Sequence, residues 1–330
     1  MAALPALSLR RLLLAALLLC PSPAWCQPKR PVAPPDERRV VEVHGSTRSY
    51  YLHFPAGSRA APWPLVLLLH PAGSDAKEAM SVLRWSEAAD ENGFILVGLE
   101  ARTPSAWLPA AFSLNPRVWN SGDPGVQQEN ILASDDVAYA AAVLKQLMST
   151  YTLDTARIYA VGFSSGGGMT QRLALELPGR FAAIAAVGSL RAQPAALRKP
   201  LSVMLIYGKL DPVTPYDGGT RHTPWGDTPN MPPVTDTIAS WVRDLHCAPS
   251  AQSQQPNAQV LRETWSGCDE GAEVQAVTIA DQGHHWGGGL PDRFKASVAG
   301  PVSHSFDDTA EIWAFFAAHP QHGPKPATSP

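Results

Sequence analysis

Charge, cysteine and long hydrophobic runs are all scarce in this sequence. Charged side chains make up 17% of the 330 residues, and 26 Lys and Arg are set against 29 Asp and Glu. Without a basic excess, the composition excludes a dedicated nucleic-acid-binding surface. The one long hydrophobic run lies at the N-terminus, which excludes a protein with several membrane spans. The hydrophobic fraction of 45% is nevertheless typical of a globular chain and excludes wholesale disorder.

The N-terminal hydrophobic run has the arrangement of a secretory signal peptide. Arg10 and Arg11 precede an apolar stretch over residues 12–19, and a Pro-Ser-Pro segment follows before Cys26. A basic start, a short apolar core and small residues near a cleavage point are typical of export signals. We therefore expect residues 1–26 to be removed, and the mature protein to be secreted or periplasmic with no membrane span. The alternative is an apolar terminal helix of the core.

Loss of that segment leaves two of the four cysteines, Cys247 and Cys268. An even pair in an exported protein predicts a disulfide. Closing a loop of about 20 residues would contribute roughly 3 kcal/mol to stability. The alternative is a pair of unpaired buried thiols.

Strand and helix patterns alternate along the rest of the chain. An opening pair of strands is expected at 40–43 and 49–54, buried strands at 65–69, 94–97, 157–161, 182–187, 201–207 and 274–279, and helices at 76–91, 131–150 and 308–319. This alternation predicts an α/β domain with a mostly parallel central sheet and helices on both faces.

The domain is expected over residues 39–319, between a Pro-rich linker at 27–38 and a disordered tail at 320–330. Residues 103–128 are rich in Pro, Asn, Gly and Trp and show little periodicity. A loop of that length is usually functional or disordered.

A Gly-x-Ser-x-Gly segment around Ser164 lies between an expected strand and an expected helix. In a nucleophile elbow the serine occupies a tight strand-to-helix turn, and glycines on either side leave room for the neighbouring backbone. Ser165 is a weaker candidate because Phe163 stands where the first glycine would be needed. The pattern therefore predicts Ser164 as a nucleophile; the alternative is an ordinary glycine-rich turn.

Asp211 comes directly after the expected strand 201–207, where a carboxylate can orient an imidazole. Asp217 and Asp236 are rivals that do not follow a buried strand, and a solvated turn aspartate is the alternative. The order of serine, then acid, then histidine along the chain is the order of a hydrolase triad.

His284 and His285 follow the last expected strand, where a general base would lie. Adjacent loop histidines point in different directions, so only one of them can reach Ser164. A metal site with Asp281 is the competing interpretation, but the spacing does not match a zinc set. We expect His284 to be the base, and no metal.

The loop that follows strand 65–69 reads His70-Pro71-Ala72-Gly73. Such a loop donates one backbone N–H to the oxyanion of the transition state, and the residue after the nucleophile donates another. Pro71 has no N–H. The expected donors are therefore the backbone amides of Ala72 and Ser165, with His70 as a structural hydrogen-bonding residue.

With these motifs the chain resembles the esterase family that includes poly(3-hydroxybutyrate) (PHB) depolymerases and feruloyl or acetylxylan esterases, of the α/β-hydrolase fold. The blocks at 154–159 and 208–219 carry the resemblance most specifically, and the matching stretches span roughly residues 40–317. The oxyanion loop departs from the family pattern at Pro71, and the residue after Trp286 departs at Gly287.

The resemblance implies a serine esterase that works through an acyl-enzyme with Ser164, Asp211 and His284, and that needs no cofactor. It also implies a disulfide between Cys247 and Cys268. The implied partner is an ester substrate: a PHB-type hydroxyalkanoate oligomer, or a feruloyl or acetyl ester of plant polysaccharide. The alternatives are a serine peptidase of the same fold and a non-catalytic binding protein.

Four tryptophans lie in expected loops or beside the base: Trp107, Trp119, Trp225 and Trp286. Exposed aromatic rings could stack on a sugar or phenolic acid or grip a polyester chain. We expect Trp119 and Trp286 to contact the substrate. Because no separate binding module follows the domain, soluble oligomers or plant-type esters are expected rather than insoluble polymer.

Overall fold

The computed structural model describes residues 34–57, 61–192, 195–291 and 296–321. The predicted signal peptide lies outside the described residues, as do most of the predicted linker and tail. The described linker residues include the start of the first strand, at Glu37. In the part described, no helix is both long and apolar enough to cross a membrane.

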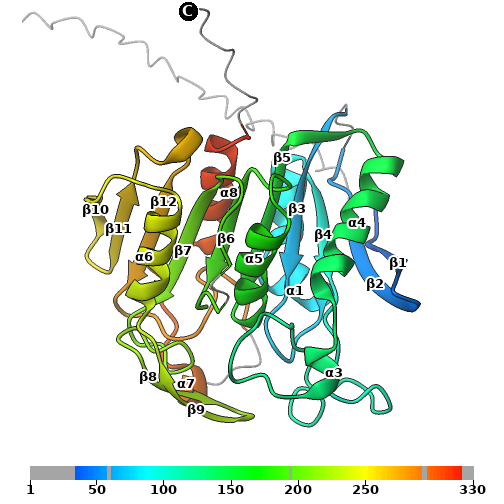
Figure 1. Ribbon diagram of the computed structural model, residues 1–330, viewed down its shortest axis with the longest axis horizontal. Coiled ribbons are helices and arrows are strands. Elements are labelled where there is room, and N and C mark those ends of the chain that lie inside the picture. The colour runs from blue at the N-terminus through cyan, green and yellow to red at the C-terminus, as the bar shows by residue number, and fades with distance from the viewer. Residues whose placement is uncertain (1–33, 58–60, 193–194, 292–295, 322–330) are drawn as a thin grey trace, which may run out of the picture. The chain divides into compact units, whose positions relative to one another are not determined.

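The centre of the structure is a ten-stranded sheet in the order β1-β2-β4-β3-β5-β6-β7-β12-β11-β10 (Figure 1). Its six middle strands run parallel to one another, as expected for the α/β-hydrolase fold. In spatial order they are β4 (Ile95–Leu99), β3 (Trp63–Leu69), β5 (Leu153–Phe163), β6 (Ala183–Val187), β7 (Ser202–Gly208) and β12 (Val274–Ile279).

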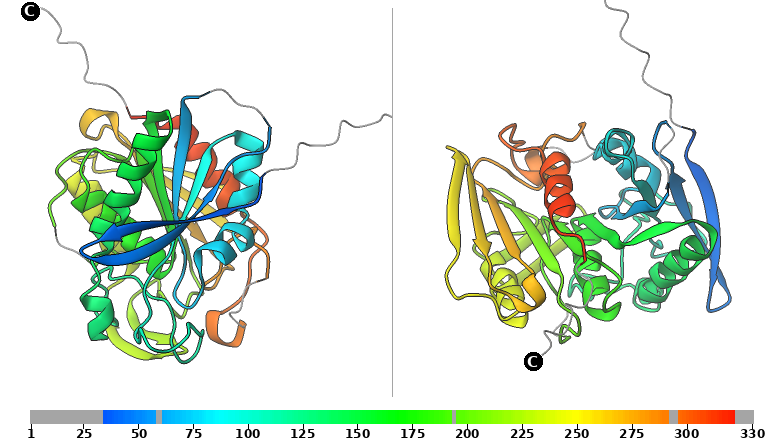
Figure 2. Two further views of the ribbon diagram at one scale, coloured as in Figure 1. Left: turned by 90° about the vertical axis from the view of Figure 1, so that its right-hand side faces the viewer. Right: turned by 90° about the horizontal axis from the view of Figure 1, so that it is seen from above.

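Helices cover both faces of this sheet, and each face has its own core (Figure 2). Alternate residues of β3 point to opposite sides, so Leu65, Leu67 and Leu69 pack with α4, α5 and α6, while Val66 and Leu68 pack with α1, α2 and α8. The helices are α1 (Ala76–Val82), α2 (Trp85–Asn92), α3 (Glu129–Leu132), α4 (Asp136–Thr150), α5 (Ser165–Glu176), α6 (Val234–Asp244), α7 (Ala296–Ala299) and α8 (Asp308–Ala318). The predicted layers are confirmed.

Two predicted helices are each divided in two. The helix expected at 76–91 breaks at Arg84, which has a left-handed backbone with φ of 60°. The helix expected at 131–150 is interrupted before Asp135, whose side chain accepts a hydrogen bond from the backbone N–H of Ala138 and starts α4 anew. Both breaks occur inside an apolar periodicity that continues across them, which is why the pattern alone did not place them.

The sequence patterns missed four strands. Two extend the sheet antiparallel beyond β12, and two form a separate hairpin. Three of these strands are largely solvent-exposed and the fourth is mostly half-buried, so they lack the apolar pattern that marks a buried strand. The outer antiparallel strands of the sheet are β1 (Glu37–Val43) and β2 (Ser46–His53) at one edge and β11 (Val260–Trp265) and β10 (Gln252–Asn257) at the other, and the separate hairpin is β8 (Gly219–Thr223) and β9 (Gly226–Met231).

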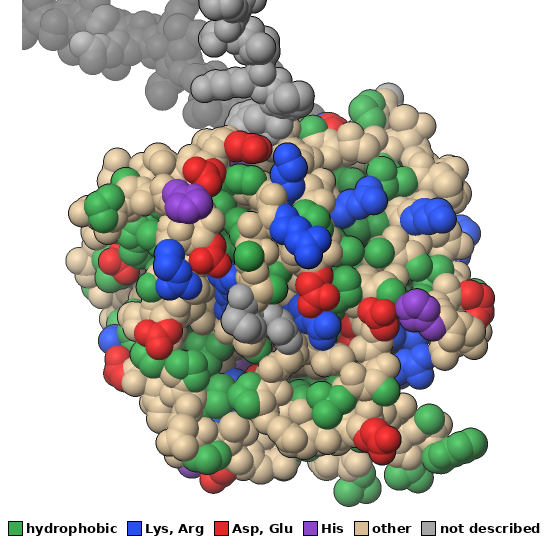
Figure 3. Space-filling model, viewed as in Figure 1, with side chains coloured by type: hydrophobic (Ala, Val, Ile, Leu, Met, Phe, Trp, Pro, Cys, Tyr) green, Lys and Arg blue, Asp and Glu red, His purple; other side chains and the backbone are tan. Residues whose placement is uncertain are grey.

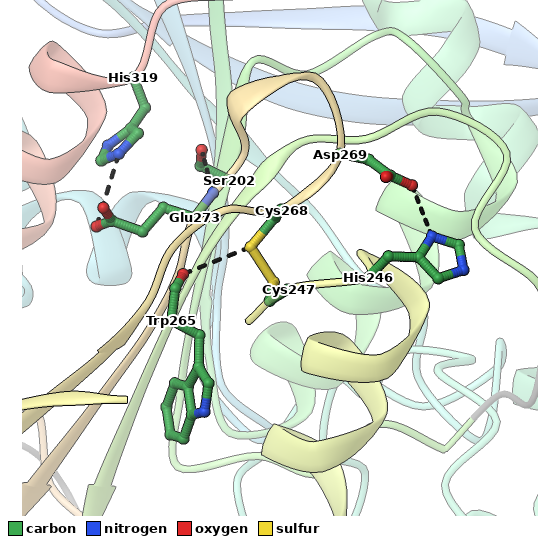
Figure 4. Close-up of a disulfide and its surroundings, with 8 residues drawn as sticks. All are labelled: Ser202, His246, Cys247, Trp265, Cys268, Asp269, Glu273 and His319. Carbon is green, nitrogen blue, oxygen red and sulfur yellow. Dashed lines mark hydrogen bonds and ion pairs between the residues drawn. A yellow bond between two sulfur atoms is a disulfide. The ribbon is translucent and has the colours of Figure 1, made fainter. Parts of the chain in front are cut away.

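The disulfide predicted between Cys247 and Cys268 is present and links the end of α6 to the loop before β12 (Figure 4). The two cysteines are 21 residues apart in the chain. Beside the bond, the backbone N–H of Asp269 donates to the carbonyl of Leu245, so the crosslink reinforces a contact that the backbone also makes.

Replacing both Cys247 and Cys268 by serine should lower the free energy of unfolding by about 2–4 kcal/mol, because the crosslink restricts the unfolded chain. Denaturant unfolding of the two proteins measures this difference. Reductant should destabilise the wild type by the same amount and leave the double variant unaffected. Equal stability of the two proteins would contradict a stabilising role for the bond.

Candidate active site

Ser164 lies at the junction between β5 and α5. Its backbone has φ of 54° and ψ of −122°, a conformation that L-residues rarely adopt and that costs free energy. The serine is also the N-cap of α5, so the unpaired N–H groups of the first helical turn and the positive end of the helix dipole lie beside its hydroxyl. This turn has the geometry of the predicted nucleophile elbow.

The two glycines that flank Ser164 permit the turn because backbone passes close to both. A Cβ atom on Gly166 would lie 2.1 Å from the carbonyl oxygen of Leu69 at the end of β3. A Cβ atom on Gly162 would lie 2.3 Å from backbone atoms of Gly166. Any side chain at either position would push α5 away from the sheet and release the strained turn.

A continuous chain of hydrogen bonds joins the three residues that the sequence singled out. The hydroxyl of Ser164 lies 2.8 Å from Nε2 of His284, and Nδ1 of the same ring lies 2.7 Å from a carboxylate oxygen of Asp211. Asp211 and His284 are 5% and 1% exposed, so both hydrogen bonds to the ring are protected from water. These are the contacts of a nucleophile, a base and an orienting acid.

Protein groups hold the acid and the base in place. The second carboxylate oxygen of Asp211 accepts the backbone N–H groups of Val213 and Thr214, each at 2.7 Å. The His284 ring stacks on Phe163, with ring centroids 4.9 Å apart. The orientation of the imidazole is therefore set on two sides, by a carboxylate and by an aromatic face.

The rival residues of the sequence analysis do not join this chain. Nε2 of His285 donates to the carbonyl of Gly300, so this histidine is directed elsewhere. Asp217 is exposed and pairs with Lys209, and Asp236 is an exposed residue in the first turn of α6. Of the alternatives weighed, His284 is the one hydrogen-bonded to Ser164, and Asp211 is the one hydrogen-bonded to His284.

The loop after β3 is held by the ring of His70. Burial lowers the pKa of His70 to about 4, so the imidazole is neutral at neutral pH. Its Nδ1–H donates to the carbonyl of Pro71, and its Nε2 accepts the backbone N–H of Ala101. His70 is thus the structural hydrogen-bonding residue that was expected.

Of the backbone amides at positions 71–73, that of Ala72 is the one available to bind an oxyanion. Gly73 donates its backbone N–H to the carbonyl of Arg117, and Pro71 has none to give. Within the described part of the chain, the amides of Ala72 and Ser165 have no hydrogen-bond acceptor, and both residues line the same cavity as Ser164. The two expected oxyanion donors are therefore brought together with Ser164, the expected nucleophile.

The two tryptophans expected to contact substrate require a correction. Trp119 is fully buried, and its indole N–H donates to the carbonyl of His70. Trp286 is 5% exposed, and its indole N–H donates to the hydroxyl of Thr309. Both rings pack inside the protein because a polar partner for each N–H lies there. They belong to the framework of the site and do not line its cavity.

A cavity of about 610 Å³ opens at Ser164, within the size range of pockets for small organic ligands. Two segments form most of its walls: the loop 103–128 and the hairpin β8–β9. They meet through an ion pair between Arg221 and Asp123 at 2.6 Å. The indole N–H of Trp225 also donates to the carbonyl of Phe112.

Sequence reasoning marked the loop 103–128 as functional or disordered and named Trp225 among its loop tryptophans, but it did not identify the hairpin. The signal available was the dense turn composition around Trp225, where Pro and Gly flank the ring. The lining that results is mixed, with hydroxyl groups and charges beside Leu190, Val213 and Trp225.

Comparison with known proteins agrees with this arrangement. The model of the family described as esterase PHB depolymerase matches residues 48–264. The match includes Ser164 and Asp211 and ends before His284, so the position of the base rests on the geometry above.

Among curated proteins, NocK of Nocardia uniformis subsp. tsuyamanensis, which is named as an esterase, is 34% identical over 79% of this chain and 77% of its own length. Feruloyl esterase C of Emericella nidulans is 27% identical over 84% of this chain and 86% of its own length. A bifunctional acetylxylan esterase/xylanase of Neocallimastix patriciarum is 24% identical over 84% of this chain, which spans only 34% of that larger protein.

Solved structures share the fold at low sequence identity. The acetyl xylan esterase from Aspergillus awamori superposes with a TM-score of 0.52 and 13% identity, covering 81% of this chain and 94% of its own. The native structure titled sOPH gives a TM-score of 0.55 and 15% identity, covering 90% and 91%. Together with the family match, these likenesses show that the chain belongs to the PHB depolymerase esterase family of the α/β-hydrolase fold and is a carboxylic ester hydrolase.

Proposed function

We propose that this esterase is a serine hydrolase that cleaves its ester through an acyl-enzyme, with Ser164 as nucleophile, His284 as general base and Asp211 as orienting acid. The observation that carries the proposal is the unbroken hydrogen-bond chain from the hydroxyl of Ser164 to the carboxylate of Asp211, at distances of 2.8 and 2.7 Å. No metal or organic cofactor enters the proposed reaction.

In the first step, Nε2 of His284 accepts the proton of the Ser164 hydroxyl while the oxygen attacks the ester carbonyl carbon. The Asp211 carboxylate holds the Nδ1–H tautomer, which keeps Nε2 free to accept that proton. His284 then donates the proton to the departing alkoxide, leaving the acyl group on Ser164. Water, deprotonated by the same ring, attacks the acyl-enzyme and releases the acid.

The negative charge on the carbonyl oxygen in each transition state is proposed to be bound by the backbone amides of Ala72 and Ser165. Ser165 begins α5, so its N–H also carries the positive end of the helix dipole. Each such donor is typically worth roughly 3–4 kcal/mol in the transition state, because it is already oriented and shielded from water.

The proposed substrates are PHB-type hydroxyalkanoate oligomers or feruloyl and acetyl esters of plant polysaccharide. The names of the relatives support both groups: the family is described by PHB depolymerase, and its curated members include feruloyl and acetylxylan esterases. The mixed lining of the cavity suits a substrate that carries both apolar and hydroxyl or carbonyl groups.

Ser164→Ala should lower kcat by at least roughly 1,000-fold on every ester that the wild type cleaves, because the covalent step is lost. The panel should contain p-nitrophenyl acetate and butyrate, methyl ferulate, acetylated xylan and hydroxybutyrate oligomers. The acyl group that the wild type cleaves fastest identifies which of the proposed substrate classes applies. The melting temperature should stay nearly unchanged, and substantial turnover by a folded Ser164→Ala protein would refute the assignment.

Trp119 is proposed to position both oxyanion donors. Its indole N–H donates at 2.9 Å to the carbonyl of His70, in the loop that presents Ala72. Its backbone N–H donates at 3.2 Å to the hydroxyl of Ser165. One residue therefore connects the loop after β3 to the first turn of α5, which fixes the spacing of the two amides.

Trp119→Phe should lower kcat by about tenfold with little change in KM, because the loss of one net hydrogen bond of about 1.4 kcal/mol falls on the transition state. Affinity for an alkyl boronic acid, whose tetrahedral adduct places an oxygen in the oxyanion site, should fall by the same factor.

Trp241→Phe is the matched control, since this fully buried indole donates to Gln171, which does not itself line the cavity. That variant should lose stability and keep its kcat. If Trp119→Phe changes stability alone, as expected for the control, the positioning role is wrong.

Export is also proposed. A disulfide in a protein of this family supports an oxidising compartment, and the N-terminal sequence has the order of a signal peptide. When the full-length chain is expressed in a bacterial host, mass spectrometry of the protein outside the cytoplasm should show a chain that begins near Gln27. An exported or cytoplasmic chain that keeps residues 1–26 would contradict cleavage at this position.

A further inference from the structure

In the described part of the chain, Arg221 is the one cationic residue that lines the cavity at Ser164. It lies on β8 in the hairpin wall, and its side chain is 12% exposed. The other charged residues of the lining are Asp123 and Asp227. A guanidinium that is largely removed from water loses free energy unless its donors are paired. The partners of Arg221 therefore show what this side chain is still able to bind.

The described residues satisfy only part of the guanidinium. Nη1 of Arg221 donates to one carboxylate oxygen of Asp123 at 2.6 Å. The other oxygen of Asp123 accepts the backbone N–H of Gly125 at 2.8 Å, which fixes this carboxylate within its own loop. Nε of Arg221 is buried without an acceptor among the described residues, and Nη2 makes no hydrogen bond to them either. Asp123 thus orients Arg221 and leaves several of its five N–H donors for a ligand.

The backbone beside Arg221 is tied to the loop that carries the proposed catalytic acid. The N–H of His222 donates at 3.0 Å to the carbonyl of Pro212, which directly follows Asp211. Thr214 of the same loop donates its backbone N–H to Asp211 and also lines the cavity. The hydrogen-bonded loop therefore fixes the guanidinium relative to the proposed triad, and both face one cavity.

The surface around the cavity supplies little other positive charge. In Figure 3 Lys and Arg side chains gather over the upper and middle parts of the face, and few lie over its lower part, where Figure 1 places the hairpin β8–β9. Asp227 is 60% exposed to water and pairs with His222 at 3.0 Å. An anion in the cavity would thus be held by Arg221 itself and not by a general basic field.

We propose that Arg221 binds a free carboxylate of the substrate, so that the enzyme prefers esters whose alcohol part carries an acid group close to the scissile bond. This inference rests on the proposed serine esterase function and narrows its substrate class. Among the proposed substrates, the acid end of a hydroxyalkanoate oligomer has this chemistry, whereas an acetyl or feruloyl ester of a neutral sugar does not. Cleavage of the last ester bond releases one hydroxy acid as the alcohol product.

The geometry of arginine favours a carboxylate over the other acceptors that an ester substrate offers. The planar guanidinium matches the two oxygens of a carboxylate, and the opposite charges strengthen both hydrogen bonds. A carbonyl or hydroxyl oxygen supplies one acceptor and no net charge. Internal bonds of a polyester chain have only such neutral neighbours, so Arg221 distinguishes the acid end of the chain from its interior.

The test compares two substrates that differ only in this group. One is the linear 3-hydroxybutyrate dimer with its free acid, and the other is the same dimer with a primary amide in place of the acid. The wild type should cleave the acid with a kcat/KM at least about tenfold above that of the amide, because a charge-assisted bidentate contact is lost with the amide. Arg221→Gln should bring this ratio close to one, mainly by raising KM for the acid.

Asp123→Asn is the matched control, because it breaks the same ion pair between the cavity walls and keeps Arg221. Since it also removes a competing carboxylate, the ratio should stay at the wild-type value or rise. Arg221→Lys returns the charge without the planar fork and should restore only part of the ratio. Loss of the preference in Asp123→Asn as well as in Arg221→Gln would mean that the ion pair merely shapes the wall, and it would overturn the carboxylate role.

Salt separates a site in the cavity from attraction over the surface. Raising the NaCl concentration from about 0.1 to about 0.5 M should leave the wild-type ratio within about twofold, because a contact shielded from solvent is screened less than a long-range one. Collapse of the ratio in high salt would overturn the proposal.

A neutral alkyl fluorophosphonate that labels Ser164 counts the folded active sites in each variant. If the wild type were labelled at Ser164 and cleaved both dimers equally well, the inference about Arg221 would be wrong and the esterase mechanism would stand. If the wild type were not labelled there, or if Ser164→Ala retained its turnover, the proposed mechanism itself would fail.

Discussion

The contact on which the site depends is the close approach of the first turn of α5 to the end of β3. At Gly166 the helix backbone lies so near the carbonyl of Leu69 that a Cβ atom would stand 2.1 Å from that oxygen. This contact forces the chain through the strained turn at Ser164, whose φ is 54°. The loop that begins at His70 leaves the same strand end. One backbone contact therefore locates the proposed nucleophile and both candidate oxyanion donors relative to each other, before any substrate is bound.

The sheet could be predicted where burial leaves a mark on the sequence. Strands β3, β4, β6 and β7 are buried on both faces, and their continuous apolar runs placed them correctly. The strand β10 is exposed along its whole length and reads Gln-Ser-Gln-Gln-Pro-Asn, which carries no strand signal. Its existence depends on pairing with β11, a long-range contact that local sequence does not encode. The helix breaks at Arg84 and before Asp135 were missed for a related reason, since the apolar periodicity runs through them.

The same distinction, between local sequence signals and long-range contacts, separates the site residues that could be predicted from those that could not. Ser164, Asp211 and His284 each follow a buried strand, and the parallel arrangement brings those strand ends to one edge, so order and position along the chain were informative. The tryptophans were not predictable in this way. Whether an indole in a loop faces solvent or the interior depends on where its N–H finds an acceptor. For Trp119 that acceptor is the carbonyl of His70, far away in sequence. The ring of Trp107, by contrast, is 92% exposed.

The chemistry and the recognition of substrate therefore reside in different parts of the chain. The proposed catalytic groups lie at the edge of the sheet, where backbone packing that tolerates little change fixes them. The cavity walls come from the loop 103–128 and the hairpin β8–β9, which touch each other through Arg221 and Asp123 and contribute Trp119 and Met231 to one core. Loops of this kind can change length and composition at small cost to stability. Relatives that share this fold carry the names of different esters, and the substrate of this chain must be inferred from the walls of its cavity.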